Sequence, residues 1–266
     1  MRRFSESYLQ RTRQGMWDDS RAALADLELD SRTNILDVGC GTGEFTRVLT
    51  DESDARVVGV DADTDLLSVA TDRPGIEVTA GDATRLPFSD DSFDLVVCQA
   101  LLVNLPDPIA AVREFARVSS DLVATVEPDN AAVGVDSTVA AEVPLERTVR
   151  EAFLDGVQTN VALGERVTDV FDAAGLSLVG TRRYHHRKLV EPPYDEWDVQ
   201  SAAQKATGEG LDRHEAELRR GLDAPDTYDA LRREWRQMGR EVVEQIRDGE
   251  YRRAEVVPFD VTTGRV

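Results

Sequence analysis

The chain has 266 residues, of which 51 are acidic and 31 basic, so its formal net charge at pH 7 is −20. A field of that sign repels phosphate backbones and disfavours nucleic acid as a partner. No apolar run approaches the roughly 20 residues that span a bilayer, and residues 1–6 lack the apolar stretch of a secretory signal. We expect a cytoplasmic monomer or homodimer without membrane or nucleic-acid partners.

Cysteine and lysine are both scarce. The two cysteines, Cys40 and Cys98, are flanked by glycines and by an apolar run, which is neither a disulfide framework nor metal-ligand spacing. We expect reduced thiols and no metal site. Lys188 and Lys205 are the only lysines. An acid excess with so few lysines resembles the proteins of salt-loving archaea, in which a carboxylate-rich surface maintains solubility at high ionic strength.

Strands and helices are predicted to alternate after a leading helical stretch at residues 5–27. Apolar runs, turn residues and helix caps predict strands at residues 34–38, 56–61, 76–80, 93–99 and 122–127, and helices at 44–50, 65–71 and from Pro108, which follows Asp107 as a capping residue. This alternation favours an α/β, Rossmann-like, doubly wound fold with a mostly parallel sheet.

The second half of the chain is less regular. It predicts helices at residues 144–154 and 165–174, a long strand at 176–190, a charged helical region at 195–249 and an edge strand at 254–263 that tolerates Pro258. The sheet then has seven strands, with a helical insertion before the last one. The expected divisions are an N-terminal helical segment (1–30), a core (31–190), a helical insertion or cap (191–252) and a final strand that returns to the sheet (253–266).

A glycine-rich turn follows the first strand. The segment DVGCGTGE starts at Asp37 and places Gly39, Gly41 and Gly43 at alternate positions before a predicted helix. Glycine lets a ligand approach the backbone closely, and the free amides of a helix N-terminus are hydrogen-bond donors. A turn alone needs fewer glycines. We therefore interpret the turn as the floor of a cofactor site.

The nature of the cofactor is limited by charge. A nicotinamide dinucleotide site has the pattern G-x-G-x-x-G, but Glu44 stands at the sixth position here. A carboxylate there opposes a pyrophosphate. S-adenosylmethionine has no phosphate and carries a sulfonium and an ammonium, which suit Asp37 and Glu44 better.

Two further acidic residues follow later strands. Asp61 ends the second strand, about twenty residues past the glycines, where a carboxylate can accept both hydroxyls of a ribose. Asp82 follows the third strand and can accept a hydrogen bond from an adenine amino group, while Ala83 and Leu86 can pack on the ring. A strand also often ends in aspartate simply to form a turn.

The segments ILDVGCGTG, GVDAD, GDATRLPFSDDSFDLVV and LVNLPDP resemble the class I S-adenosylmethionine-dependent methyltransferases in order and spacing, over about residues 34–127. The branch that is most similar is the small-molecule one that includes the quinone-biosynthesis methyltransferases (methyltransferase type 11-like). The resemblance implies S-adenosylmethionine as cofactor, with S-adenosylhomocysteine as product. It assigns Asp37, Gly39, Cys40, Gly41 and Gly43 to the methionine end, Asp61 and Ala62 to the ribose, Asp82 and Ala83 to the adenine, and Gln99 to the loop beside the methyl donor.

The acceptor is not specified by these motifs. Histidines often precede Leu-Pro in the quinone branch, but residues 101–108 contain none. Asn104-Leu105-Pro106 also differs from the Asn/Asp-Pro-Pro-Tyr/Phe box of amide and adenine N-methyltransferases. Cys98 lacks the electropositive neighbours of a nucleophile, so we expect it to pack in the core. No catalytic residue is assigned.

Other candidates lie outside the shared motifs. His185 and His186 point to opposite faces of a strand, so only one of them can serve as a base or an anion contact, and both are compatible with a solvated strand. Aromatic and basic residues that either line a site or anchor helices are Tyr8, Arg13, Trp17, Trp197 and Trp235.

Three functions remain compatible with the sequence. The first is methyl transfer to a small-molecule acceptor by in-line displacement. The second is a non-catalytic S-adenosylmethionine-binding subunit that regulates or scaffolds another protein. The third is a nicotinamide-dependent oxidoreductase, against which Glu44 argues.

The acidic composition leads to a prediction about salt. If it reflects adaptation to high ionic strength, the free energy of unfolding rises between dilute buffer and molar salt, because counterions relieve repulsion among the carboxylates. Chemical denaturation with urea at several concentrations of KCl measures this change. A stability that is constant or falls with salt contradicts the adaptation.

Overall fold

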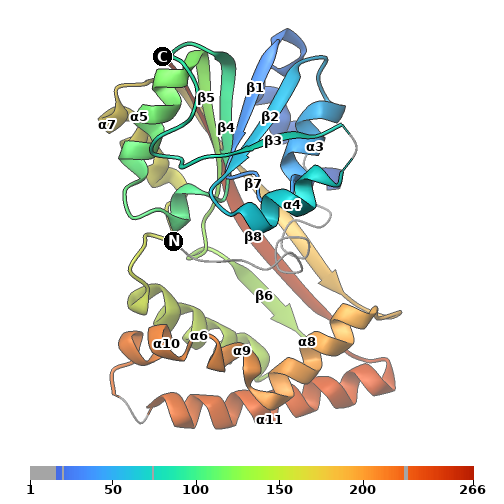
Figure 1. Ribbon diagram of the computed structural model, residues 1–266. Helices are drawn as coiled ribbons and strands as arrows, with labels where there is room; N and C mark the ends of the chain where they lie inside the picture. The colour runs from blue at the N-terminus through green and yellow to red at the C-terminus, as the bar shows by residue number, and fades with distance from the viewer. Residues whose placement is uncertain (1–15, 20, 74, 225–226) are drawn as a thin grey trace. The chain divides into compact units, whose positions relative to one another are not determined.

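The computed structural model describes residues 16–19, 21–73, 75–224 and 227–266, which divide into two units (Figure 1). Unit 1 contains the described residues up to Asp129 together with Leu163–His186 and Pro258–Val266. Unit 2 contains Asn130–Ala162 and Arg187–Val257. None of the helices in the described residues is long and apolar enough to cross a membrane.

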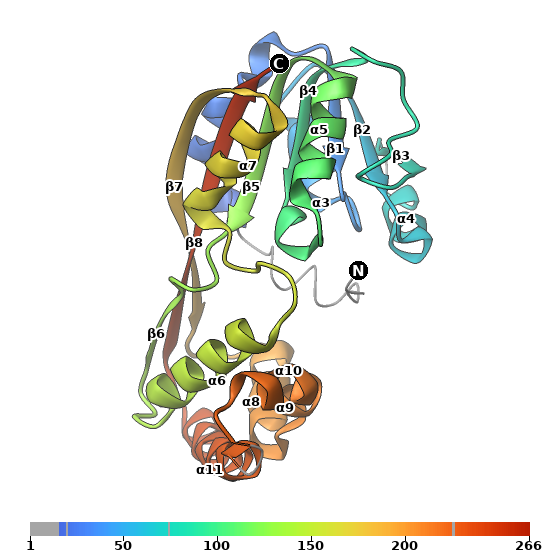
Figure 2. The ribbon, with the colours of Figure 1, turned by 90° about the vertical axis from the view of Figure 1, so that its left-hand side faces the viewer.

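Unit 1 is built on a twisted sheet in which strands alternate with helices (Figure 2). Its strands are β1 (Asn34–Val38), β2 (Arg56–Asp61), β3 (Glu77–Ala80), β4 (Phe93–Gln99) and β5 (Ser119–Pro128), joined by parts of β7 (Ser177–Val190) and β8 (Arg253–Arg265). The helices of this unit are α2 (Met16–Asp19), α3 (Glu44–Asp51), α4 (Thr64–Thr71), α5 (Pro108–Val118) and α7 (Val167–Ala174), with 3-10 turns at Arg21–Leu27, Leu29–Ser31, Leu102–Asn104 and Gly164–Arg166.

The strand order confirms the predicted α/β Rossmann-like fold. Among the described residues the sheet has eight strands in the order β3-β2-β1-β4-β5-β8-β6, and β7 also pairs with β8. Strands β1 to β5 are parallel, whereas β8 runs antiparallel to β5. From β1 the chain continues to β2 and β3 on one side of the sheet and then crosses to β4 and β5 on the other side. The strand order therefore reverses between β1 and β4, which is where doubly wound sheets bind ligands.

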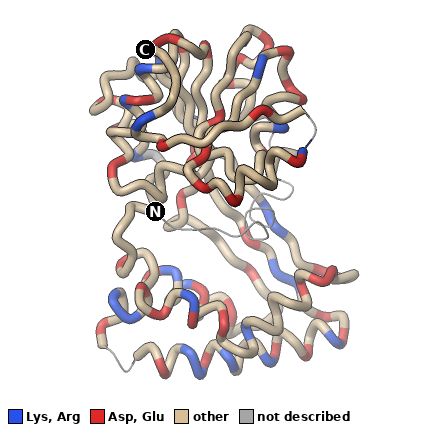
Figure 3. Tube along the Cα trace, in the orientation of Figure 1, with Lys and Arg blue, Asp and Glu red and all other residues tan. Residues whose placement is uncertain are grey.

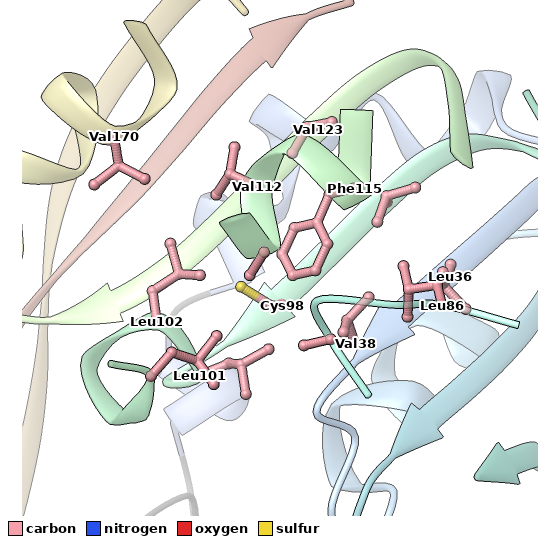
Figure 4. Packing of buried hydrophobic residues seen from close by; sticks show 14 of the residues in the cluster. Leu36, Val38, Leu86, Cys98, Leu101, Leu102, Val112, Phe115, Val123 and Val170 are labelled. Atoms are coloured by element: carbon pink, nitrogen blue, oxygen red, sulfur yellow. The ribbon is translucent and has the colours of Figure 1, made fainter. Parts of the chain in front are cut away.

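Two apolar clusters cover the faces of this sheet. On one face α5 and α7 pack through residues such as Phe115 and Phe171, both of them fully buried. Figure 4 shows Phe115 of α5 and Val170 of α7 in this cluster. On the other face α3 and the N-terminal turns pack through Phe45, Leu27 and Trp17, and the ring of Trp17 stacks on Phe45 with 4.8 Å between centroids. Both faces of the parallel strands are thereby removed from water, as their apolar runs require.

The last strand differs from its prediction. The predicted edge strand at residues 254–263 is wrong, since β8 pairs with β5 and β6 along its length and also with β7, and so lies inside the sheet. Pro258 is tolerated for another reason than an edge position. The pairing of β8 with β6 ends at Val256 and its pairing with β5 begins at Phe259, so the residue that lacks an N–H falls where the partner changes.

Unit 2 is mainly helical. Its elements are β6 (Gly134–Ser137), α6 (Glu142–Gly156), α8 (Glu196–Thr207), α9 (Glu209–Asp212), α10 (Glu215–Gly221) and α11 (Thr227–Asp248). The long helix α11 buries Tyr228, Leu231, Trp235, Met238 and Val242, which recur every three or four residues and so form one apolar stripe. Acidic and basic residues are interspersed along the rest of these helices (Figure 3).

A buried ion-pair network lies inside unit 2. The Glu142 carboxylate is fully buried and accepts a hydrogen bond of 2.9 Å from the Tyr251 hydroxyl. Lys205 donates from Nζ to Glu142 and, at 3.0 Å, to Glu146. Removing one partner would leave an uncompensated buried charge, which is strongly destabilising.

The division of the chain also differs from the predicted one. Residues 130–162 were expected in the core but group with the helical unit. The cause is a close contact between α6 and α10, in which a Cβ atom at Gly156 would collide with the backbone of Glu217 and one at Gly221 with that of Ala152. The predicted helical segment at residues 5–27 is described from residue 16 only.

A glycine contact within unit 2 gives a stability prediction. A Cβ atom at Gly239 of α11 would collide with the backbone of Lys205 and Ala206 in α8. We expect Gly239→Ala to lower the free energy of unfolding by about 1–3 kcal/mol, because overpacking outweighs the better helix propensity of alanine. Thermal and urea denaturation measure the change.

The matched control is Gly210→Ala in α9, where nothing lies within 4 Å of the added Cβ. This variant should be neutral or slightly more stable, by up to about 1 kcal/mol. Equal behaviour of the two variants would show that the close contact does not govern stability.

Candidate functional site

The predicted site residues lie at one edge of the sheet. The parallel strands place Val38 level with Val60 and Cys98, and Asp61 level with Ala80. The loops that follow β3, β2, β1 and β4 therefore meet at their carboxyl ends in that order. Neighbouring strands are about 4.8 Å apart, so the four loops extend over roughly 14 Å. This row of loops suits an elongated ligand that lies across the strand ends.

The glycine turn is held close to β2. The N–H groups of Gly39 and Cys40 donate to the carbonyl of Val60 at 2.7 and 3.1 Å. Gly39, Gly41 and Gly43 have φ angles of +74°, +56° and +81°, a left-handed conformation that side chains with a Cβ adopt only with strain. The path of the backbone therefore requires glycine at these three positions. As a result, the backbone of the turn lies at the edge of the sheet with no side chain at these positions.

Asp61 joins the first loop to the second. Its Oδ2 accepts a hydrogen bond of 2.8 Å from the N–H of Gly41, and its Oδ1 accepts one of 2.8 Å from the N–H of Asp63. Each carboxylate oxygen has about two acceptor sites. The carboxylate is therefore oriented by the backbone and keeps capacity to accept hydroxyl groups, as the ribose assignment requires. Ala62 is exposed next to it.

Asp37 and Gln99 are buried rather than exposed at the edge. Asp37 Oδ2 accepts from the Thr46 hydroxyl at 2.7 Å, which links β1 to α3. The Gln99 side chain, 4% exposed, donates from Nε2 to the sulfur of Met16 at 3.0 Å. Among the contacts described, these two side chains therefore support the loops that follow their strands.

Asp82 is exposed on the loop after β3, with Ala83 buried beside it. Its Oδ1 accepts from the hydroxyl and the N–H of Thr84 at 2.7 and 2.8 Å. These hydrogen bonds, the hydroxyl's first, hold the pKa of Asp82 below its usual value. Asp82 is therefore an ionised acceptor at neutral pH, oriented by its own loop.

The negative charge of Glu44 is paired with a basic residue, which its position in the sequence did not suggest. Its Oε1 accepts from Arg73 Nη2 at 2.7 Å in an ion pair between α3 and the end of α4, and its Oε2 accepts from the Thr42 hydroxyl. Arg73 offsets the negative charge on which the argument against a pyrophosphate rested. The charge of Glu44 therefore opposes a pyrophosphate less than the sequence suggested.

A buried carboxylate that the sequence did not point to lies at the end of β5. Glu127 is fully buried, and its carboxylate accepts backbone hydrogen bonds from Leu101, Leu102 and Val103 at 3.0, 2.8 and 3.3 Å. The Cys98 thiol donates to the same carboxylate at 3.6 Å. A lone glutamate at a strand end is no motif, and its partners are backbone groups. The available signal was an acidic residue inside an otherwise apolar run.

Burial dominates the protonation of Glu127 and Cys98. Burial raises the pKa of Glu127 to about 7, although the three backbone N–H groups oppose the change. Burial, followed by the charge of Glu127, raises the pKa of the Cys98 thiol well above its usual value. Cys98 is therefore a protonated core residue, as expected from the sequence.

The remaining candidates are dispersed. His186 is buried and His185 exposed, so they do point to opposite faces of β7. Trp17 lies in the core, Trp235 is buried within unit 2, and Trp197 is 42% exposed. Tyr8 and Arg13 lie outside the described residues.

Part of the chain is similar in sequence to known methyltransferases. Residues 36–121 match the model of a methyltransferase domain. A demethylmenaquinone methyltransferase of Lactiplantibacillus plantarum is 36% identical over 107 residues, which are 37% of this chain and 45% of that protein. The chain thus spans less than half the length of the curated relatives it matches.

Solved structures share the fold at low identity. The crystal structure of a Bacillus halodurans protein, provisionally described as a methyltransferase, aligns with a TM-score of 0.55 and 16% identity, over 93% of this chain and 98% of that one. An S-adenosylmethionine-dependent methyltransferase of Aquifex aeolicus aligns with a TM-score of 0.50 and 16% identity, over 71% of this chain and 93% of that one. Likeness at this identity establishes the fold.

The buried carboxyl of Glu127 gives a pH prediction. Because its pKa rises from 4.5 to about 7 on folding, its contribution to stability is greatest below pH 4.5 and is lost as the pH rises through about 7. We expect the loss to be of the order of 3 kcal/mol and to be absent from Glu127→Gln. Urea denaturation of both proteins between pH 4.5 and 8.5 measures it. Parallel stability profiles would contradict this assignment.

Proposed function

We propose that this protein is an S-adenosylmethionine-dependent methyltransferase that transfers a methyl group to a small-molecule acceptor. The observation that carries the proposal is the row of four loops at the carboxyl edge of β3, β2, β1 and β4, within a segment that matches a methyltransferase domain. Two carboxylates in that row, Asp61 and Asp82, are oriented by hydrogen bonds of their own loops. Both carboxylates can accept hydrogen bonds from a ligand, and their negative charge does not suit a phosphate.

The residues fit the parts of this cofactor in order along the edge. In the proposal, Asp82 and Ala83 hold the adenine and Asp61 and Ala62 the ribose. The loop residues Gly39, Cys40, Gly41 and Gly43, with Asp37 beneath them and Gln99 on the far side, hold the methionine end. A Cβ atom at Gly39 would lie 2.9 Å from Leu101 Cδ1, so a side chain there would require the Leu101 side chain to move.

The chemistry asks mainly for alignment. S-adenosylmethionine supplies a methyl group that its sulfonium already activates, and the reaction is an in-line displacement. The protein has to hold the acceptor atom and the methyl carbon in line, and positioning of this kind can contribute about 7–11 kcal/mol in favourable cases. The proposal therefore needs no dedicated catalytic residue, and none is assigned.

A small-molecule acceptor is supported by two observations. The relatives are named for methylation of a quinone precursor, a small molecule. The net charge of −20 disfavours a nucleic-acid acceptor. A cytoplasmic location, a monomeric or homodimeric state and adaptation to salt belong to the same proposal. A cap role for the helices between residues 191 and 252 is also part of it.

Ligand binding tests the cofactor assignment. By isothermal titration calorimetry we expect the wild-type protein to bind S-adenosylmethionine and S-adenosylhomocysteine but not NAD. Asp61→Asn should weaken S-adenosylhomocysteine binding by at least about tenfold, because an amide cannot accept from both backbone N–H groups and a ribose. Asp65→Asn, an exposed change on the adjacent helix α4, is the matched control and should bind normally.

Absence of S-adenosylhomocysteine binding to the wild-type protein, at low and at high salt, would overturn the proposal. Transfer of a labelled methyl group from S-adenosylmethionine into a cell extract then identifies the acceptor. Label in the small-molecule fraction supports a metabolite acceptor, and label in protein or nucleic acid contradicts it. Binding without any transfer would instead favour a non-catalytic cofactor-binding subunit.

A further inference from the structure

The segment between β4 and α5, residues 100–107, carries little regular structure, and one side chain accepts hydrogen bonds from three of its backbone N–H groups. It contains a single 3-10 turn, Leu102–Asn104. The first N–H groups of this turn have no earlier helical turn to bond to and therefore need another acceptor. Glu127 accepts from the N–H groups of Leu101, Leu102 and Val103. One buried carboxylate thus takes the place of an N-cap for the whole turn.

The same segment packs against the glycine turn. Leu101 follows Ala100, whose φ angle of +50° is unusual for a residue with a Cβ, and the Asn104 amide donates to the carbonyl of Ala100 at 2.9 Å. Leu101 lies so close to Gly39 that a Cβ atom there would be 2.9 Å from its Cδ1. Figure 4 shows Leu101, Leu102 and Cys98 together in the packed cluster. The position of Leu101 therefore bears directly on the path of the glycine turn.

We propose that Glu127 is a positioning residue that fixes residues 101–103 against the glycine turn and thereby maintains affinity for the methionine end of the cofactor. The part that concerns the cofactor rests on the proposed function. The part that concerns the segment rests on the hydrogen bonds and the contact between Leu101 and Gly39 alone.

A carboxylate is specifically suited to this position. An ionised carboxylate only accepts hydrogen bonds, and here both of its oxygens face backbone donors. A glutamine of the same shape would turn an amide donor toward one of them. The N–H of Val103, which is bonded to Oε2, or the pair of N–H groups bonded to Oε1 would lose its acceptor.

The protonation of Glu127 should therefore change the segment. Its proton would occupy one oxygen and reduce the acceptors available to the turn. Local opening that leaves Glu127 buried removes the N–H groups that lower its pKa, so protonation favours this opening, whereas global unfolding exposes Glu127 to water and is favoured by its ionisation. The titratable groups around it are Cys98 on β4, Asp37 on β1, which acts on Cys98, and Asp260, which lies opposite Glu127 on β8 and is paired with Arg183 of β7 at 2.8 Å. Residues 100–106 contain no titratable side chain. Loosening near neutral pH is thus assigned to Glu127, whose pKa is about 7.

The test compares the full-length wild-type protein with Glu127→Gln by amide hydrogen exchange and by calorimetry. In the wild-type protein, the protection factors of residues 101–103, corrected for intrinsic exchange, should be at least about tenfold higher at pH 8 than at pH 6. S-adenosylhomocysteine should bind more tightly at pH 8 by a similar factor. Glu127→Gln should show the low values at both pH values.

Glu142→Gln is the matched control, because Glu142 is also fully buried but lies in unit 2. It should keep the wild-type pH dependence of protection at residues 101–103 and of S-adenosylhomocysteine binding, even if it lowers the stability of its own unit. A Glu127→Gln variant that retains the wild-type pH dependence, or protection of residues 101–103 that does not vary with pH, would overturn the inference.

The two proposals fail in different ways. If the wild-type protein binds no S-adenosylhomocysteine at any pH but protection at residues 101–103 changes as expected, the proposed function is wrong and the positioning of the segment by Glu127 stands. If the ligand binds with an affinity that Glu127→Gln leaves unchanged while protection falls, the link from the segment to the cofactor is wrong.

Discussion

The parallel pairing of β1 with β2 on one side and β4 on the other is the constraint on which the site depends. Asn34 to Val38 pair in register with Arg56 to Val60, and Ile35 to Val38 pair with Leu95 to Cys98. A shift of one residue in either ladder would invert the apolar faces of the strand and separate the loops that follow. The glycine turn, Asp61 and the segment after β4 are neighbours only because these strands end at the same level.

Much of this arrangement could be predicted, because its signals are local. Residues 34–38, 56–61 and 93–99 are strands with the predicted bounds, since each is a short apolar run bounded by turn residues. Asp107 caps α5 by accepting from the N–H of Ala110, as the dipeptide Asp107-Pro108 predicts. The positive φ angles of Gly39, Gly41 and Gly43 follow from a similar signal, because a turn of that shape permits only glycine.

The features that could not be predicted depend on partners distant in the sequence. Arg73, which pairs with Glu44, is 29 residues away, and nothing in the local sequence indicates that pairing. Glu127 holds N–H groups about 25 residues earlier, and backbone donors leave no pattern of residue types. The grouping of residues 130–162 with the later helices likewise depends on the contact of Gly156 with α10, which becomes apparent only when the helices are packed.

The ion pairs of unit 2 have a consequence for the chemical reactivity of the protein. Both lysines of the chain, Lys188 and Lys205, lie in this unit, where Lys205 is bound to Glu142 and Glu146 and Lys188 lies 3.7 Å from Glu255. Every other positive side chain of fixed charge is a guanidinium, which does not undergo acylation under mild conditions as an amine does. The surface therefore offers few nucleophilic amines. Acetylation or ubiquitination of lysine has only two targets among these residues, both of them next to carboxylates.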